Sequence, residues 1–518
     1  MRAVTIVTGT TRVVQSLTAI LSGKILLTLG SLLLVPLYLT HWSPTVYGEW
    51  LALSAAVAYL SALDLGMNMG AVNRLTQAYA RGDAAEYTAV QRAGLAFYGC
   101  VALTGTVGLA AVVAIAPIRE RLGLVELTQW EVAFTVWILG CLILWAMPSG
   151  FILATYRSRG DLATSQWIGN GSQIFVIAAT AIALGLGGRP TVIALVQLVP
   201  LVVVTALVMR HLWSRHPSLA ASFGSWPEGM LTSLLRPSLL FVLVIVANAM
   251  TLQGSVIVVS VVLGGGAVAL FVTLRTLANV IRQVVNTLVI AVWPEITRLD
   301  VLGERAVLRS AHSLVVAVTS SVCVAFGAAL WWEGAEVIAV WTRGVLTADV
   351  TTLRLLLVLL VLQSPWIVGW VFVAASNRHA RVSIASLTSS VVGLVLAMLL
   401  VHRFGTAGVV GGLIVGDVVA CAHFVVRDAC DLVGEAYAPF ALRLWSCLVI
   451  VSTAALFSGW AAHVAVGGHF AFRWLLVGLL TSLATGATAW ALWLTSDDRE
   501  LLSKRCRPAA ARMASAKA

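Results

Sequence analysis

Two arginines and two asparagines near the middle of the chain form the pattern with the clearest chemistry. Arg275, Asn279, Arg282 and Asn286 are four, three and four residues apart, which places them on one face of a helix. The two arginines are then about 10 Å apart along the helix axis. Guanidinium groups match the oxygens of a phosphate or pyrophosphate. The spacing therefore predicts a cationic stripe that lines a wet cavity and contacts an anionic group. Pairing of the arginines with buried acids, such as Asp64 or Asp417, is the alternative.

Three further charges fall within apolar stretches. Lys24 lies about two turns into the first expected helix, where its ammonium group either lines the same cavity or extends to the lipid headgroups. Asp64 and Asp417 are the acids that we expect inside the membrane. Because charges there are costly, each acid either balances a nearby cation or binds a proton or Na⁺.

The sequence lacks the common signatures of enzymes. It contains no GxxxxGK[ST], HExxH or GxSxG motif, and its seven cysteines are scattered without the spacing of a metal site. We therefore predict no catalytic residue, no metal and no cofactor, and we expect that the protein is not an enzyme. A membrane-embedded glycan ligase or polymerase is the weaker alternative, because such enzymes usually carry a large external loop and the external loops expected here are short.

The composition indicates that membrane-spanning helices position these residues. Hydrophobic residues make up 60% of the 518 and charged residues only 11%, a balance that requires lipid as solvent. Apolar runs long enough to cross the bilayer as helices recur throughout, and no long polar segment separates them. The sequence thus predicts an all-α polytopic membrane protein. The net charge of +11 is then a property of its loops and does not indicate nucleic-acid binding.

Hydropathy and turn residues predict about 14 transmembrane helices. Gly and Pro occupy the shortest connections, as in Gly187-Gly188-Arg189-Pro190. The expected helices are 16–40, 47–71, 93–117, 130–155, 164–187, 190–209, 237–261, 266–292, 312–341, 353–376, 382–401, 405–426, 441–466 and 471–495.

The basic residues indicate the orientation of these helices. Of the 33 Lys and Arg residues, 23 fall on the side that holds both termini, 7 fall on the other side and 3 lie within helices. The rich side is cytoplasmic by the positive-inside rule. Both termini are therefore expected in the cytoplasm, as an even number of crossings also requires.

A constant offset of 221 residues relates the two halves. It pairs Thr76 with Thr297, Gly82 with Gly303 and Arg157 with Arg378. Because each copy contains six helices, the copies enter the membrane from the same side and form parallel repeats about an axis along the membrane normal. General similarity in hydropathy between two membrane halves is the alternative explanation. The predicted parts are an N-lobe 1–215 (helices 1–6), a C-lobe 216–435 (helices 7–12), helices 13 and 14 at 436–496, and a basic cytoplasmic tail 497–518.

The segment 36–94 carries a family-like motif. It contains Tyr47-Gly48-Glu49-Trp50, then Leu63-Asp64-Leu65-Gly66, Arg74 and Gly82-Asp83. This pattern resembles the polysaccharide transporters and O-antigen flippases of the multidrug/oligosaccharidyl-lipid/polysaccharide exporter superfamily. The resemblance implies two helical lobes around a central cavity and a lipid-phosphate or lipid-pyrophosphate oligosaccharide as cargo.

Related flippases of lipid-linked peptidoglycan precursors line their cavity with cations from helices 1, 2 and 8. Lys24 and the pair Arg275 and Arg282 match helices 1 and 8. Helix 2 departs from this pattern, because it offers Asp64 and Asn68. Arg74 lies only at the cytoplasmic mouth of the helix, where we expect it to act as a gate.

Together these features predict a flippase that moves a lipid-linked oligosaccharide across the cell inner membrane by alternating access, for cell-surface polysaccharide biosynthesis. Membrane lipids are further expected partners, a polysaccharide polymerase or export machinery is a candidate partner, and nucleic acid is not expected. The rival prediction is a multidrug or small-molecule exporter of the same superfamily. Exporters of cationic drugs favour acidic and aromatic cavities, whereas the charges on helices 1 and 8 here are positive.

Overall fold

The computed structural model describes residues 2–215, 224–235, 239–376, 380–466 and 470–493. These residues are almost entirely helical, and no strand occurs among them. Thirteen described helical stretches are long and apolar enough to cross a membrane. Large apolar side chains lie bare along them, including Val107, Leu399 and Leu442, which are 70%, 68% and 72% exposed. Such surfaces require lipid as solvent. The predicted all-α polytopic class is confirmed, and the chain is a multi-pass membrane protein.

The chain forms two compact units, Met1–Val272 and Thr273–Ala518, whose boundary lies inside one long helix. The lobe limits expected at 215 and 435 stay a prediction. The basic tail 497–518, and the residue Arg378 of the proposed repeat, lie outside the described residues. One pair of the repeat can be compared locally. Gly82 and Gly303 end their helices with φ of 70° and 69°, and a long helix follows each of them.

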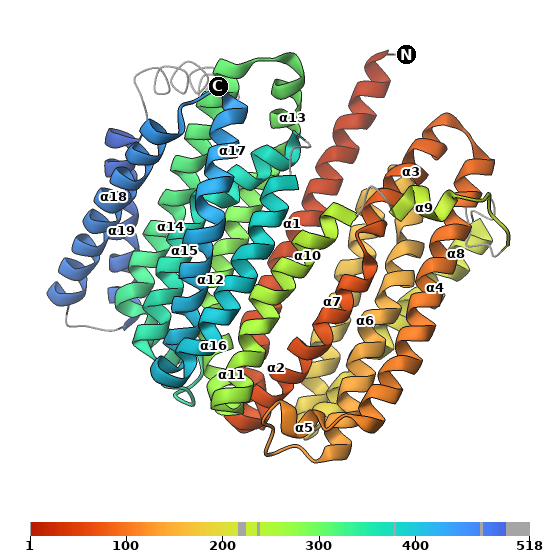
Figure 1. Cartoon of the computed structure of the whole chain (residues 1–518), viewed down its shortest axis with the longest axis horizontal. Coiled ribbons are helices and arrows are strands. Elements are labelled where there is room, and N and C mark those ends of the chain that lie inside the picture. Colours follow the sequence, from red (N-terminus) through yellow and green to blue (C-terminus); the bar gives the residue numbers. More distant parts are fainter. Residues whose placement is uncertain (1, 216–223, 236–238, 377–379, 467–469, 494–518) are drawn as a thin grey trace, which may run out of the picture. The chain divides into compact units, whose positions relative to one another are not determined.

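The helix α6 is central to unit 1. It contacts α2, α3, α4, α7 and α8, and its sixteen buried residues are mostly apolar or small. Figure 1 shows α6 among these neighbours. The elements of unit 1 are α1 (Arg2–His41), α2 (Pro44–Ala58), η1 (Tyr59–Asp64), α3 (Met67–Arg81), α4 (Ala84–Ile115), α5 (Ile118–Arg121), α6 (Gln129–Ser158), α7 (Leu162–Gly185), α8 (Pro190–Arg215), α9 (Met230–Leu235), α10 (Leu239–Ala249), η4 (Met250–Gly254) and α11 (Ser255–Leu263).

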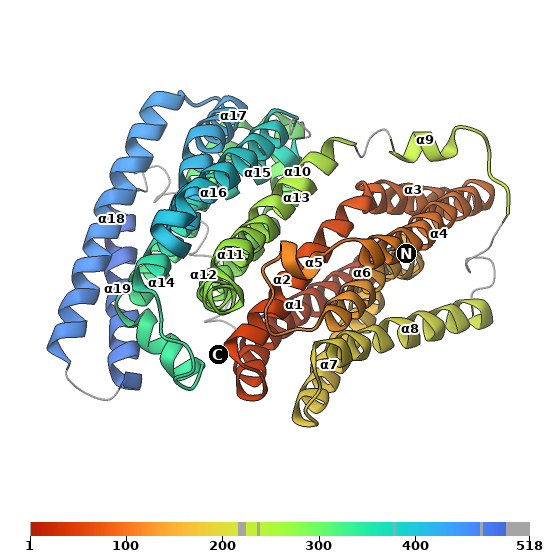
Figure 2. The same cartoon turned by 60° about the horizontal axis from the view of Figure 1, so that its bottom comes forward.

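Unit 2 is built around α14 and α15, which pack against each other and carry its main apolar core. The last two helices, α18 and α19, lie side by side against α14 (Figures 1 and 2). The unit comprises most of α12 (Gly265–Ala291), then α13 (Trp293–Leu302), α14 (Arg305–Trp341), α15 (Val350–Ala375), α16 (Ala380–Asp417), η5 (Val418–Ala422), α17 (His423–Val433), α18 (Tyr437–Ala465) and α19 (Phe470–Leu492).

The stretch Ala380–Val433 is a hairpin of two helical arms. Its 54 residues would measure about 80 Å as one straight helix, far beyond the roughly 30 Å hydrocarbon core. Gly405, with φ 59° and ψ −143°, reverses the chain within α16. The two arms match the helices predicted at 382–401 and 405–426. The glycines at 412 and 416 sit against backbone atoms of Ala397 and Gly393 in the other arm, which is the close packing that small residues permit.

The second predicted helix, 47–71, is not continuous. After α2 the chain tightens into the 3₁₀ turn η1, which ends at Asp64. Leu65 and Gly66 then adopt left-handed conformations, with φ of 50° and 69°, before α3 begins. Glycine tolerates this conformation and leucine does not favour it. The Leu-Asp-Leu-Gly segment is therefore a helix break, and its acid stands at the break.

The Tyr-Gly-Glu-Trp segment is buried within unit 1. Glu49 is fully buried, and its carboxylate accepts hydrogen bonds from the backbone N–H groups of Val125, Glu126 and Leu127 at 2.6, 2.8 and 2.9 Å. A Cβ atom on Gly48 would lie 1.7 Å from the carbonyl oxygen of Gly265, so only glycine fits there. Both residues have structural roles: the first fixes a loop, and the second allows two backbones to meet.

A buried ion cluster attaches α18 and α19 to α14. Glu333 on α14 is fully buried, and the Arg473 guanidinium donates to both of its carboxylate oxygens at 3.0 Å. The ring of His463 lies 2.7 Å from the same carboxylate, and Arg473 also pairs with Glu336. The last helices are thus held by charge as well as by apolar contacts.

Candidate functional site

The predicted stripe lies on the single helix α12. Arg275, Asn279, Arg282 and Asn286 are all half-buried. The two asparagines make no side-chain hydrogen bond to any other described residue, which leaves their amide groups available to solvent or a ligand. The neighbouring face packs into the protein through fully buried residues such as Leu274 and Val285. The helix α12 therefore has an apolar face that packs into the protein and a polar face that carries the stripe.

Arg282 is linked to Asp417 through Gln363. The Arg282 guanidinium donates to the amide oxygen of Gln363, and the amide nitrogen of Gln363 donates to the Asp417 carboxylate. Arginine only donates hydrogen bonds and a carboxylate only accepts them. A glutamine amide can join the two, because its oxygen accepts from the arginine and its nitrogen donates to the carboxylate. The Ser389 hydroxyl completes the network with a hydrogen bond of 2.6 Å to the other Asp417 oxygen. Arg282 and Asp417 are therefore joined through Gln363, and no direct ion pair between them is recorded.

The backbone is irregular beside Asp417. This residue ends α16, and the π-helical turn η5 follows it at once. Turns of this kind occur often at functional sites, since they turn side chains and carbonyl groups away from the regular helical positions. The same irregularity lets one acid reach both α15, through Gln363, and the preceding arm of its own hairpin, through Ser389.

Asp64 in unit 1 has a simpler environment. The Tyr98 hydroxyl donates to its Oδ1 at 2.6 Å, and its Oδ2 has no hydrogen-bond partner among the described residues. Asn68, one turn further on, accepts from the Arg157 guanidinium at 3.2 Å. Asp64 itself pairs with no cation in the described part of the chain. Backbone breaks at membrane depth are tolerated where they are buried in protein or line a water-filled cavity.

Lys24 and Arg74, the other two predicted cations, belong to unit 1. Lys24 is half-buried on α1 and makes no ion pair with a described carboxylate. Arg74 on α3 donates to Glu86 at 2.8 Å and to Ser233 on α9 at 2.6 Å, and Arg81 also pairs with Glu86. Figure 2 shows α9 beside α3. Arg74 thus joins α9, which lies between α8 and α10 in the sequence, to the rest of unit 1.

Several residues of these networks were not predicted. Tyr98, Arg157, Gln363 and Ser389 each bond to a predicted residue. Gln363 had a sequence signal, because it is the one amide side chain in the largely apolar run of the helix predicted at 353–376. Arg157 was assigned to a loop, but the structure places it in the last turn of α6.

Comparison with known proteins rests on structure. No protein-family profile matches the sequence, and no curated protein resembles it closely enough to be matched. Solved structures do match. The lipid II flippase MurJ, in an inward closed conformation, gives a TM-score of 0.69 at 12% identity, over 92% of this chain and 98% of its own.

Multidrug transporters match as well. An inward-facing MATE family transporter of the MOP superfamily gives a TM-score of 0.61 at 16% identity, over 77% of this chain and 97% of its own. The MATE multidrug transporter DinF-BH gives 0.59 at 16% identity, over 82% and 97%. These neighbours are transporters or flippases and not enzymes. At such identities the likeness establishes the fold: the chain has the fold shared by the MATE transporters of the MOP superfamily and the lipid II flippase MurJ.

Proposed function

We propose that the protein is a flippase that moves a lipid-linked oligosaccharide with a phosphate or pyrophosphate headgroup across the cell inner membrane by alternating access. The observation that carries this proposal is the stripe of Arg275 and Arg282 on α12, together with the unbonded amides of Asn279 and Asn286. Guanidinium and amide donors at this spacing suit the oxygens of an anionic headgroup. Cell-surface polysaccharide synthesis is the pathway that needs such cargo, with a polymerase or export complex as partner.

The alternative is a multidrug exporter, because MATE transporters share the fold. Two observations favour the flippase. A cationic stripe repels the cationic compounds that many drug exporters carry. The match to the lipid II flippase also extends over more of this chain, 92% against 77% and 82% for the two multidrug transporters.

The lobes predicted at 1–215 and 216–435 are the bodies that would alternate, with both termini in the cytoplasm as the 23 to 7 charge asymmetry indicates. In this scheme Lys24 adds a second cation to the cavity and Arg74 acts at its cytoplasmic mouth. Reporter fusions after residues 45, 265 and 468 should be external, and fusions after 82, 160 and 303 internal. An inverted fusion would contradict the orientation at that point.

Asp64 is the residue that we propose for ion coupling. It stands at a helix break, one of its carboxylate oxygens accepts no hydrogen bond from a described residue, and it pairs with no described cation. These are the properties of a carboxylate that takes up H⁺ or Na⁺. Asp417 is the charge balance for Arg282. The pH or Na⁺ dependence of transport should therefore require Asp64 and be lost when it is replaced.

The proposal can be tested with the purified chain in proteoliposomes. The probes are a fluorescent polyprenyl-pyrophosphate oligosaccharide and the cationic dye ethidium. The wild type should move the lipid and not the dye. Arg275→Ala and Arg282→Ala should each reduce lipid transport by about tenfold or more, and lysine should rescue only partly because it lacks the bidentate fork.

Arg298→Ala is the matched control, since Arg298 is an exposed arginine on the next helix that pairs with Glu295. Immunoblots must show equal amounts of inserted protein for all variants. Wild-type lipid transport in both alanine variants would exclude α12 as the headgroup site. Transport of the dye and not of the lipid would establish the multidrug alternative.

A further inference from the structure

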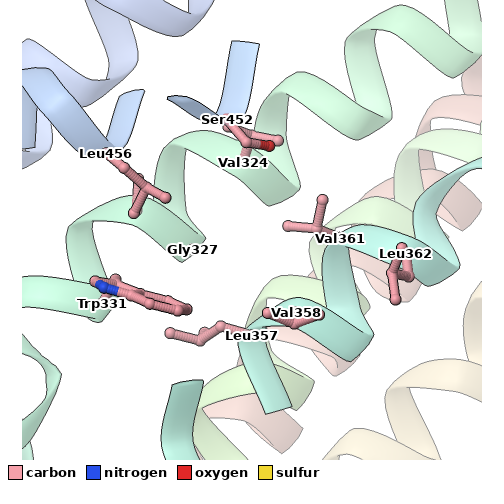
Figure 3. Close-up of a pocket in the computed structure, with 10 residues that line it drawn as sticks. Val324, Gly327, Trp331, Leu357, Val358, Val361, Leu362, Ser452 and Leu456 are labelled. Atoms are coloured by element: carbon pink, nitrogen blue, oxygen red, sulfur yellow. The ribbon is translucent and has the colours of Figure 1, made fainter. Parts of the chain in front are cut away.

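An apolar pocket lies in unit 2 between α14, α15 and α18 (Figure 3). Its volume is about 180 Å³. An apolar cavity of about 150 Å³ can hold a benzene ring, so this pocket has room for a segment of hydrocarbon chain. Ser452 supplies the one hydroxyl group of the wall. The wall is formed mainly by Val324, Gly327, Trp331, Leu357, Val361 and Leu456.

A cation lies at one end of this pocket. The Arg354 guanidinium carbon is 4.9 Å from the ring centre of Trp331, a wall residue, and 6.0 Å from that of Trp332. Arg354 precedes Leu357 and Val361 by three and seven residues, so all three share one face of α15. Contact with the two indole rings holds the guanidinium beside the pocket wall. A positive charge and an apolar slot are therefore aligned along one helix.

Arg354 has no acid partner in the described part of the chain. The two carboxylates on the adjoining turns of α14, Glu333 and Glu336, are both bound by Arg473. Arg354 makes no ion pair with a described residue, and its Nε atom is buried without a hydrogen-bond partner. A half-buried arginine of this kind is costly unless an anion from outside the chain reaches it.

We propose that this region binds an anionic phospholipid of the bilayer, with its phosphate on Arg354 and one acyl chain in the pocket. Charge complementarity selects the headgroup, since an unpaired guanidinium favours phosphate. The apolar wall suits the chain, because a hydrocarbon segment packs against it and leaves no polar group unsatisfied there. No residue of α12 lines the pocket, so the site is independent of the headgroup stripe and goes beyond the proposed function. Its occupant would fix α18 to the α14–α15 pair.

The test uses the delipidated full chain in detergent, with phosphatidylglycerol as the probe and native mass spectrometry as the measurement. Phosphatidylglycerol should bind more tightly than the zwitterionic phosphatidylcholine. Arg354→Gln should weaken phosphatidylglycerol binding about tenfold, the equivalent of roughly 1.4 kcal/mol for a lost charge-assisted contact. Arg403→Gln is the matched control, because Arg403 also lies over an aromatic ring, that of Phe404 at 5.6 Å, but neither residue belongs to the pocket wall. It should bind the lipid as the wild type does.

A second variant tests the chain-binding half. A Cβ atom on Gly327 would meet only Val361, at 3.7 Å, so Gly327→Leu can fill the pocket without displacing backbone. It should also weaken binding, whereas Gly478→Leu, at a position on α19 with nothing within 4 Å, should not.

Three results would overturn the inference. The first is wild-type affinity in both Arg354→Gln and Gly327→Leu. The second is phosphatidylcholine binding as tight as that of phosphatidylglycerol. The third is competition by glycerol 1-phosphate as strong as that of the whole lipid, because it would show a headgroup site without a chain.

Discussion

Asp64 in unit 1 and Asp417 in unit 2 are the same residue type in similar apolar settings, and each stands where a helix loses its regular form. Asp417 precedes a π turn, and both of its oxygens are occupied, by Ser389 and Gln363. Asp64 precedes two left-handed residues and accepts one described hydrogen bond, from Tyr98.

The difference lies in the nearest cation. Gln363 joins Asp417 to Arg282, whereas the arginine near Asp64, Arg157, bonds to Asn68. A carboxylate with a hydrogen bond on each oxygen supports the fold, and one with an oxygen that accepts no hydrogen bond from a described residue can take up an ion. Four substitutions test this contrast through the free energy of unfolding.

Asp417→Ala should have the largest effect. It leaves Arg282 without its balancing charge and removes the acceptor for Ser389 and Gln363. Unfolding in detergent should be easier by about 3 kcal/mol, near the lower end for loss of one partner in a buried pair. Combining it with Arg282→Met should restore part of the loss. If the double variant is no more stable than Asp417→Ala, the two charges are not coupled.

Gln363→Leu should come next. It keeps both charges but removes the amide that joins them, so two polar groups lose a partner each. The expected loss is about 2 kcal/mol, the usual cost of leaving buried hydrogen-bonding groups unsatisfied. Gln363→Glu puts a second carboxylate against Asp417 and should destabilise further. If neither variant changes the free energy of unfolding, the link from Arg282 through Gln363 to Asp417 does not stabilise the protein.

Tyr98→Phe should cost about 1 kcal/mol, the net value of one hydrogen bond. The loss is smaller because Asp64 is half-buried, and water can replace the lost hydroxyl. Tyr87→Phe is a suitable comparison, because Tyr87 lies on the same helix, α4, and its hydroxyl bonds to the neutral Ser158 on α6. A loss as large as that of Gln363→Leu would mean that Asp64 is as tightly integrated as Asp417.

Asp64→Asn should have the smallest effect on stability, about 0.5 kcal/mol, because asparagine can still accept from Tyr98. Its effect on transport should be large. We expect the protein to be held in one conformation and the pH or Na⁺ dependence of residual transport to disappear. Retention of the wild-type profile at full rate would exclude the coupling role and make the two acids functionally alike.

Sequence spacing predicted the arrangement of site residues where all of them lie on one helix. The stripe from Arg275 to Asn286 follows from helical period alone, and its four residues share one helix as expected. The link to Asp417 could not be predicted, because Gln363 lies 81 residues from Arg282 and 54 from Asp417. Spacing inside a helix carries no information about which other helices it contacts.

Local backbone geometry was the second limit. Gly66 signals a left-handed residue, but Leu65 does not, so a continuous helix was expected across this segment. The structural role of Glu49 was hidden for a similar reason. Its partners are backbone N–H groups, which every residue type supplies except proline. A hydrogen bond to a backbone group therefore cannot be predicted from the residue type of the partner.

The attachment of α19 has a consequence for biosynthesis. Glu333 enters the membrane with α14, but its partner Arg473 is 140 residues further along the chain. At about 5–20 residues per second, the ribosome needs roughly 7–28 s to make that interval. During this time Glu333 lacks the arginine that binds both of its carboxylate oxygens in the folded protein. A chain that stops short of Arg473 therefore keeps a buried acid without its arginine partner, and we expect it to be less stable than the full chain.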